Sequence, residues 1–179
     1  VIGTDANGCV DSATATITRL ELPQVDAGFD VSFCQGTEAT LMASGNSVSY
    51  TWSDGQSGAS ITISPTQTVD YMVTGTGLNG CTASDVVNAT VLPLPQVNVG
   101  MDVSFCQGSE TTLSASGAST YEWSNGGFTR EINVSPMSST EYVVTGIALN
   151  GCVNSDTVAV TVNMLPAVSA GADVAICTG

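Results

Sequence analysis

The feature that most constrains this chain is an internal repeat of about 72 residues. Residues 22–45 and 94–117 are identical at 18 of 24 positions, and later segments of the two copies match in the same order. A period of this length indicates an array of small similar units rather than one large domain. The pattern predicts four segments: the end of an upstream repeat (1–21), two complete repeats (22–93 and 94–164) and the start of a downstream repeat (165–179).

Within each repeat the apolar residues recur at every second position, which is the period of a β-strand with one buried face. In the first complete repeat this alternation runs through Ala39, Leu41 and Ala43, Val48, Tyr50 and Trp52, Ile61 and Ile63, Val69, Tyr71 and Val73, and Val87, Ala89 and Val91. Asp-Gly and Asn-Gly pairs separate several of these sets and are typical of tight hairpins. About seven short strands per repeat, with a tryptophan on the third, predict an all-β fold of tandem immunoglobulin-like sandwiches.

Six large side chains fall on the inward face of the predicted strands and are expected in the two cores: Leu41, Trp52, Tyr71, Leu113, Trp123 and Tyr142. Two alternatives remain open for the aromatic residues. The tyrosines are either ordinary core residues or the corner tyrosines of such sandwiches, whose hydroxyl bonds to the backbone. The tryptophans are expected in the core, in preference to acting as platforms for sugars.

Charge and composition exclude several classes of function. The chain has 16 acidic residues, two arginines and neither lysine nor histidine, so its net charge is −14. Nucleic acids and anionic membranes both need cationic partners, so we predict neither nucleic-acid binding nor membrane insertion. Without histidine or lysine the chain also lacks the usual bases and nucleophile partners, and we predict that it is not an enzyme.

The chain holds six cysteines at regular places in the repeat. The absence of histidine and of Cys-x-x-Cys pairs disfavours a zinc site. Regularly placed cysteines in small domains are typical of an oxidising, extracellular setting, and we predict location at the cell surface. Cys34, Cys106 and Cys177 follow the first predicted strand of a repeat, and Cys9, Cys81 and Cys152 precede the last.

Those two places lie at opposite ends of a sandwich, roughly 25–30 Å apart for strands of this length. A disulfide tolerates about 7 Å between α-carbons, so the favoured hypothesis is a Cys34–Cys152 bond between successive repeats. The alternative is an intradomain Cys34–Cys81 bond. In the favoured scheme the remaining four cysteines pair with copies beyond the chain: Cys9, Cys81, Cys106 and Cys177.

The junctions between repeats are predicted to be stiff. Segments 20–25 and 92–97 contain proline and leucine and no glycine-serine run, which disfavours a flexible linker. Leu78 and Leu149 lie in the hairpins that carry the second cysteine, and we expect them to contact a neighbouring repeat. The array is therefore expected to form a rod.

Four motifs together resemble a known class of repeat: G-x-D-V-x-x-C-x-G, Y-x-W-S-[DN]-G, Y-x-V-T-G and N-G-C. The combination is similar to the tandem immunoglobulin-like or PKD-like repeats of giant Bacteroidota surface proteins. These include gliding-motility adhesins and extracellular filament proteins exported by type IX secretion. The resemblance covers the whole chain and implies secretion and a role in cell adhesion or filament building. It also implies O-glycosylation at Ser12 and Thr157, which lie in Asp-Ser/Thr-apolar triplets.

Oxygen-bearing side chains recur beside the predicted junctions and raise the question of calcium. Asp26 with Asp30, and Asn98 with Asp102, occupy equivalent positions in the two repeats. Clusters of such oxygens can bind Ca²⁺, although the twelve-residue calcium-loop pattern is absent. Calcium is the one cofactor considered, and no other cofactor is expected.

These observations favour a structural repeat segment: the stalk of a large secreted adhesin, or the shaft of an extracellular filament. The expected partners are neighbouring repeats and, through lateral assembly, further copies of the chain. One alternative is an adhesive module in which the repeats themselves bind a glycan or another surface. A third reading, an accessory domain of a secreted enzyme, requires a catalytic region elsewhere.

Overall fold

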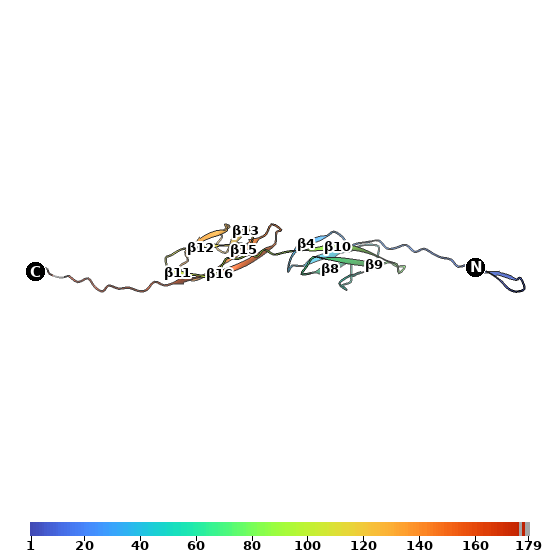
Figure 1. Cartoon of the computed structure of the whole chain (residues 1–179), viewed down its shortest axis with the longest axis horizontal. Coiled ribbons are helices and arrows are strands. Elements are labelled where there is room, and N and C mark those ends of the chain that lie inside the picture. The colour runs from blue at the N-terminus through green and yellow to red at the C-terminus, as the bar shows by residue number, and fades with distance from the viewer. Residues whose placement is uncertain (176, 178–179) are drawn as a thin grey trace. The chain divides into compact units, whose positions relative to one another are not determined.

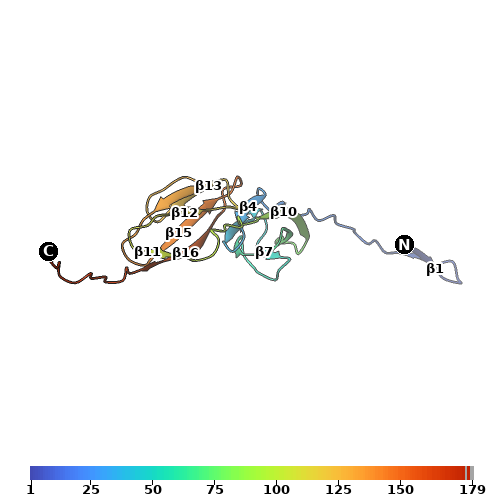
Figure 2. The ribbon, with the colours of Figure 1, turned by 60° about the vertical axis from the view of Figure 1, so that its left-hand side comes forward.

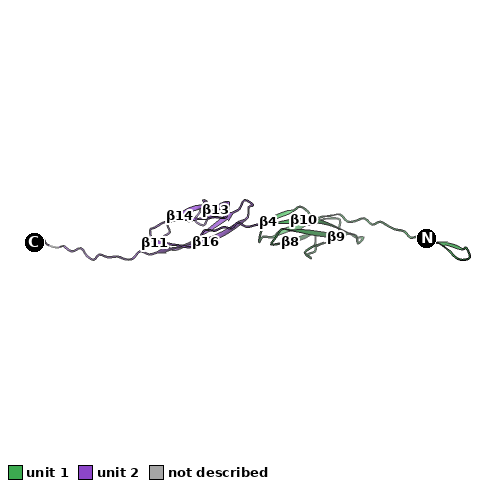
Figure 3. Ribbon diagram, viewed as in Figure 1, with its two compact units in different colours: residues 1–91 green, residues 92–179 purple. Residues whose placement is uncertain are grey.

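A computed structural model describes residues 1–175 and 177 of the chain (Figure 1). The chain divides into two compact units, Val1–Val91 and Leu92–Gly179 (Figure 3). The described residues form strands and turns and include no helix, hence none that is long and apolar enough to cross a membrane.

The first unit contains a four-stranded sheet with the order β4-β10-β9-β7, together with two short strand pairs, β3-β6 and β5-β8. The hairpin β1-β2 precedes it. The strands are β1 (Ile2–Thr4), β2 (Val10–Ser12), β3 (Val25–Asp26), β4 (Val31–Cys34), β5 (Ala39–Met42), β6 (Ser44–Gly45), β7 (Ser49–Trp52), β8 (Ser60–Ile63), β9 (Val69–Thr76) and β10 (Thr82–Leu92).

The second unit repeats this plan with a four-stranded sheet of order β11-β16-β15-β13 and a pair β12-β14 (Figure 2). Its strands are β11 (Val103–Cys106), β12 (Thr111–Ser114), β13 (Thr120–Trp123), β14 (Glu131–Val134), β15 (Thr140–Ile147) and β16 (Val153–Asn163). β11 runs parallel to β16, with Cys106 opposite Asn163, whereas β15 pairs antiparallel with both β13 and β16.

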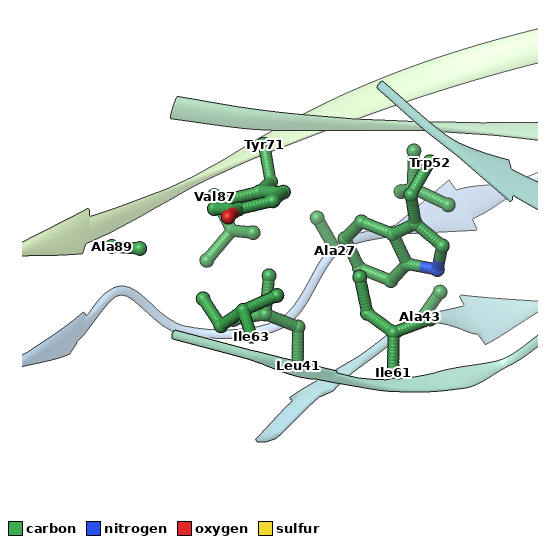
Figure 4. Packing of buried hydrophobic residues seen from close by; sticks show 10 residues of the cluster. Ala27, Leu41, Ala43, Trp52, Ile61, Ile63, Tyr71, Val87 and Ala89 are labelled. Carbon is green, nitrogen blue, oxygen red and sulfur yellow. The ribbon is translucent and has the colours of Figure 1, made fainter. Parts of the chain in front are cut away.

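In each unit, one core lies between the four-stranded sheet and the shorter strand pair. Figure 4 shows Leu41 and Ile61 of the pair β5-β8 facing Trp52 and Tyr71 of the larger sheet. The six large side chains considered above are all buried, with exposures between 1% for Leu41 and 9% for Tyr142. This two-layer arrangement is an immunoglobulin-like β-sandwich, and the predicted fold class is confirmed for both units.

Two residues of the alternating pattern are exposed. Val48 is 58% exposed and Val69 is 41% exposed. Val48 precedes β7 and Val69 is the first residue of β9, so both lie at strand starts, at the edge of the buried zone. Alternation alone does not show where burial along a strand ends.

The tyrosine that bonds to the backbone lies on a different strand from the one considered in the sequence. Tyr121 of β13 donates its hydroxyl to the Ala118 carbonyl at 3.0 Å and accepts the Ala118 amide at 3.1 Å. Tyr71 and Tyr142, by contrast, belong to the two core clusters. Burial, with a smaller contribution from the charge of Asp54, raises the pKa of Tyr71. These features favour the core reading for Tyr71 and Tyr142.

The hairpins after the tryptophans contain three-residue loops. The Gly55 amide bonds to the Trp52 carbonyl, and the Trp52 amide bonds to the Gln56 carbonyl, each at 2.9 Å. Gly55 has φ +90°, a left-handed conformation that favours glycine, and this closes the turn. The two units differ strongly in the sequence that follows, which reads QSGA over 56–59 and GFTR over 127–130.

Candidate functional site: the cysteine turns and linkers

The cysteines fall into two chemical states. Cys34 and Cys152 are disulfide-bonded. The other four cysteines carry free thiols: Cys9, Cys81, Cys106 and Cys177. Because Cys81 is one of these, Cys34 is not bonded to it, and the intradomain alternative is contradicted.

The two cysteine positions of one unit lie at opposite ends of its long last strand. In the second unit Cys106 is opposite Asn163, the last residue of β16, whereas Cys152 directly precedes Val153, the first. The eleven residues of β16 span about 36 Å at roughly 3.3 Å per residue. This separation is far beyond the reach of a disulfide within the unit.

The cysteine that ends β4 or β11 is held by a tight turn. In the first unit the Thr37 amide and hydroxyl both bond to the Cys34 carbonyl, at 3.0 and 2.7 Å. Gly36 has φ +83°, which supplies the left-handed residue that such a turn requires. In the second unit the Ser109 amide bonds to the Cys106 carbonyl at 3.1 Å, and the turn is the same.

The second cysteine is held by an asparagine that also grips the linker. In the first unit Asn79 accepts the Cys81 amide at 3.1 Å and donates its side-chain amide to the Glu21 carbonyl at 2.8 Å. In the second unit Asn150 accepts the Cys152 amide and donates to the Pro93 carbonyl, each at 3.0 Å. We call this pair of bonds the asparagine clamp. It fixes the cysteine hairpin to the chain segment that enters the same unit.

The hairpin of the upstream copy, which contains Cys9, has the same turn as the other two hairpins. A different type of side chain accepts the cysteine amide in it. The Asp5 amide bonds to the Cys9 carbonyl at 2.9 Å, as the Ala148 amide does to Cys152. Here the Asp5 carboxylate, rather than an asparagine, accepts the Cys9 amide at 2.9 Å. The Cys9 amide, followed by that of Asn7, lowers the pKa of Asp5.

A pair of carboxylates connects the entry of each unit to its last strand. In the first unit Asp30 accepts the Asn88 amide of β10, and Asp85 of β10 accepts the Ala27 amide, each at 2.8 Å. Hydrogen bonding to the Ala27 amide, followed by that to Val86, lowers the pKa of Asp85. We call these reciprocal bonds the carboxylate clasp.

The second unit contains the same clasp. Asp102 accepts the Ala159 amide and Asp156 accepts the Val99 amide, each at 2.9 Å. The aspartate of the G-x-D-V motif therefore ties the segment before β4 or β11 to the last strand of the same sandwich. Its recurrence in both repeats has a structural explanation.

A buried glycine lets the linker approach the central strand closely. Gly146 of β15 is buried, and a Cβ added there would lie 2.5 Å from Cγ2 of Val97 and 2.6 Å from Cβ of Ala118. Gly75 of β9 lies in an equivalent place, where a Cβ would meet Ser47 and Val25. The glycine of the Y-x-V-T-G motif thus makes room for the incoming chain.

The four side chains considered for calcium accept backbone amides of their own units. Asp26 accepts the Gly28 amide at 2.7 Å, and Asn98 accepts that of Gly100 at 2.8 Å. Asp30 and Asp102 belong to the carboxylate clasps. Among the described residues no group of three or more histidine, cysteine or acidic side chains is arranged to hold a metal ion. Calcium binding stays a prediction.

The remaining candidate residues are exposed. Leu78 and Leu149, at the tips of the cysteine hairpins, are 93% and 96% exposed. Ser12 and Thr157 are also exposed, and each amide bonds to the preceding aspartate at 2.8 Å. Contact of the leucines with a neighbouring repeat and glycosylation of the hydroxyl groups stay predictions.

The asparagine clamp and the carboxylate clasp were not anticipated from the sequence. Both join a side chain to a backbone atom more than fifty residues away, and the backbone partner has no sequence signature. The available signal was repetition: Asn79 and Asn150 share the N-G-C motif, and Asp85 and Asp156 follow a serine in both repeats.

Comparison with known proteins yields no family and several structures of similar type. No protein-family model and no curated protein matches the chain. A two-domain DIP-gamma fragment aligns with TM-score 0.38 and 15% identity, covering 78% of this chain and 97% of that one. An I-band fragment of titin gives 0.39 and 13%, with 79% and 66% covered. A Ca²⁺-stabilized adhesin that helps an Antarctic bacterium bind ice gives 0.40 and 14%, with 92% and 56% covered. The fold assignment rests on strand order and register, independently of these likenesses.

Proposed function

We propose that this chain is a structural repeat segment, the stalk of a large secreted adhesin or the shaft of an extracellular filament. In this proposal a Cys34–Cys152 disulfide, the staple, joins one repeat to the next. The observation that carries it is the state of the cysteines. Cys34 and Cys152 are disulfide-bonded, whereas the four cysteines whose partners would belong to repeats outside the chain are free thiols.

Features of each unit support a mechanical role. The asparagine clamp holds the linker segments at Glu21 and Pro93, so the chain enters each unit along a fixed route. The carboxylate clasp then ties that entry to the last strand, from which the chain leaves. Fixed entry and exit favour a stiff array, and we propose that the full array is a rod.

A peptide map of the non-reduced protein tests the staple. A protease that cleaves after glutamate separates Cys34 (22–38) from Cys81 and Cys106 (39–110), and Cys152 falls in 142–179. We expect a crosslinked product of peptides 22–38 and 142–179, and the same product in a Cys177→Ser variant. A crosslink between 22–38 and 39–110 would contradict the proposal.

The setting of the protein is also part of the proposal. Disulfide-bonded cysteines and a net charge of −14 fit an extracellular protein at the cell surface. Bacteroidota origin, type IX export and a role in gliding motility come from the motif resemblance alone. Protease shaving of intact cells carrying the full-length protein tests surface location, and retention of the protein inside the cells would argue against it.

A second candidate function, glycan binding, has one specific observation in its favour. In the second unit a groove of about 470 Å³ is lined by Tyr121, Phe128 and Arg130 among others. Phe128 is 72% exposed, and Arg130 is one of only two cationic side chains in the chain. An exposed aromatic ring beside a cation would suit an acidic sugar. Titration with acidic oligosaccharides, comparing the parent with a Phe128→Ala variant, tests this; equal responses would exclude the groove.

A further inference from the structure

We infer that the staple keeps residues 35–151, and with them most of both cores, off the covalent path that carries tension, so that pulling does not unfold those parts. This inference rests on the proposed Cys34–Cys152 bond. It adds a property that stiffness alone does not provide, since a stiff array of unstapled domains still lengthens when its domains unfold.

The proposed disulfide shortens the covalent path between the two ends of the chain. Tension applied at the two chain ends follows the shortest covalent path, which runs along 1–34, crosses the staple and continues along 152–179. Residues 35–151 form a closed loop off this path. The loop contains β5–β15, which supply most of the buried side chains, whereas Ala27, Val158 and Val160 stay on the path.

The loaded strand of the second unit has almost no length left to give. In the second unit the path follows β16, whose eleven residues are already extended at about 3.3 Å per residue. The limit for a fully stretched chain is roughly 3.3–3.6 Å per residue. In the first unit the path follows β3 and β4 and leaves at Cys34.

Repetition of the same bond creates a second path in a longer array. Segment 81–106 contains β10, the linker and β11, and it carries a thiol at each end. Bonded to the preceding and following repeats, this segment would bypass two cores in the same way. The array would then carry tension along two separate covalent paths, which we call the two strings.

In the first unit the two strings lie side by side. One string uses 22–34 and the other uses 81–93, and β4 is the neighbour of β10 in the sheet. The carboxylate clasp of Asp30 and Asp85 joins these same two segments at 2.8 Å. The reciprocal bonds therefore couple the two load-bearing segments to each other.

Single-molecule pulling from residues 1 and 179 tests the inference. The protein carries Cys9→Ser, Cys81→Ser, Cys106→Ser and Cys177→Ser, so that only the staple forms. The matched control adds Cys34→Ser and Cys152→Ser. We expect the stapled chain to stop lengthening about 400 Å short of the control, the extended length of residues 35–151 at roughly 3.4 Å per residue. Addition of reductant should release that length.

The outcomes separate the two proposals. A peptide map of the same sample that lacks the Cys34–Cys152 crosslink overturns the staple, and this inference with it. A correct map, together with lengthening of the stapled chain in steps at the forces that unfold the domains of the control, overturns this inference alone. A correct map with the missing length of about 400 Å and without those unfolding steps supports both.

Discussion

Replacement of Gly146 by alanine should destabilise the second unit, because the linker lies against β15 where a side chain would go. The new Cβ would lie 2.5 Å from Cγ2 of Val97 and 2.6 Å from Cβ of Ala118. Carbon atoms in contact are normally about 3.5–4.0 Å apart, so both contacts are about 1 Å too short. The Ala118 Cβ is fixed to the backbone and cannot rotate away.

The expected magnitude follows from two opposing terms. Overpacking of a well-packed site costs about 1–3 kcal/mol. Removal of a glycine from the unfolded chain returns about 0.4–1 kcal/mol. Because one of the two contacts is with a fixed Cβ, we take the overpacking cost as about 2–3 kcal/mol, so the net loss in the free energy of unfolding is about 1–2.6 kcal/mol. The midpoint of thermal unfolding should fall by roughly 4–20 °C for a domain of this size.

Urea unfolding followed by tryptophan fluorescence measures this loss. A Trp52→Phe background leaves Trp123 as the only tryptophan, so the signal reports the second unit. Glu141→Ala, at an exposed position of the same strand, is the control and should change stability by less than about 0.5 kcal/mol. Ala118→Gly should partly rescue the Gly146→Ala variant. A Gly146→Ala variant as stable as its parent would show that Val97 does not lie against β15.

Three further predictions concern the same regions. Ser47→Ala should stabilise the first unit by about 1 kcal/mol in urea unfolding, because the buried Ser47 hydroxyl has no hydrogen-bond partner among the described residues; a loss of stability would mean that the hydroxyl is satisfied. Asn150→Ala should cost the second unit about 1–2 kcal/mol, because both bonds of the clamp are lost, and should slow reoxidation of the reduced protein; unchanged rate and stability would refute a holding role for the clamp. Folding lowers the pKa of Asp85, so its contribution to stability is complete well above the pKa of a free aspartate, about 3.9, and is lost as pH falls through the folded-state pKa. Unfolding measured between pH 6 and pH 2 should therefore show a steeper loss in the parent than in Asp85→Asn, and parallel curves would contradict the assignment.

The sequence was sufficient to predict the sandwich because one buried face per strand imposes a period of two on the chain. Leu41 and Trp52 obey that period, and both are buried. The ends of strands were less accessible, as the exposure of Val48 shows, because burial there depends on how far the opposite layer reaches.

The contacts that organise the candidate site were harder to foresee. Asn79 and Asp85 each bond to a backbone atom 58 residues away. Any residue type could stand at the receiving position, so nothing in the letters marks the partner. The recurrence of G-x-D-V and N-G-C showed that these residues mattered in each copy without showing what they bind.

The loop after each tryptophan is the place where the two copies diverge, QSGA in one and GFTR in the other, on an otherwise shared frame. In the stapled chain both loops belong to the part that bears no load. Substitutions or insertions in these loops would therefore leave the load-bearing segments of each copy unchanged. One long protein of this kind can thus present a different surface in each repeat while its load-bearing segments stay the same.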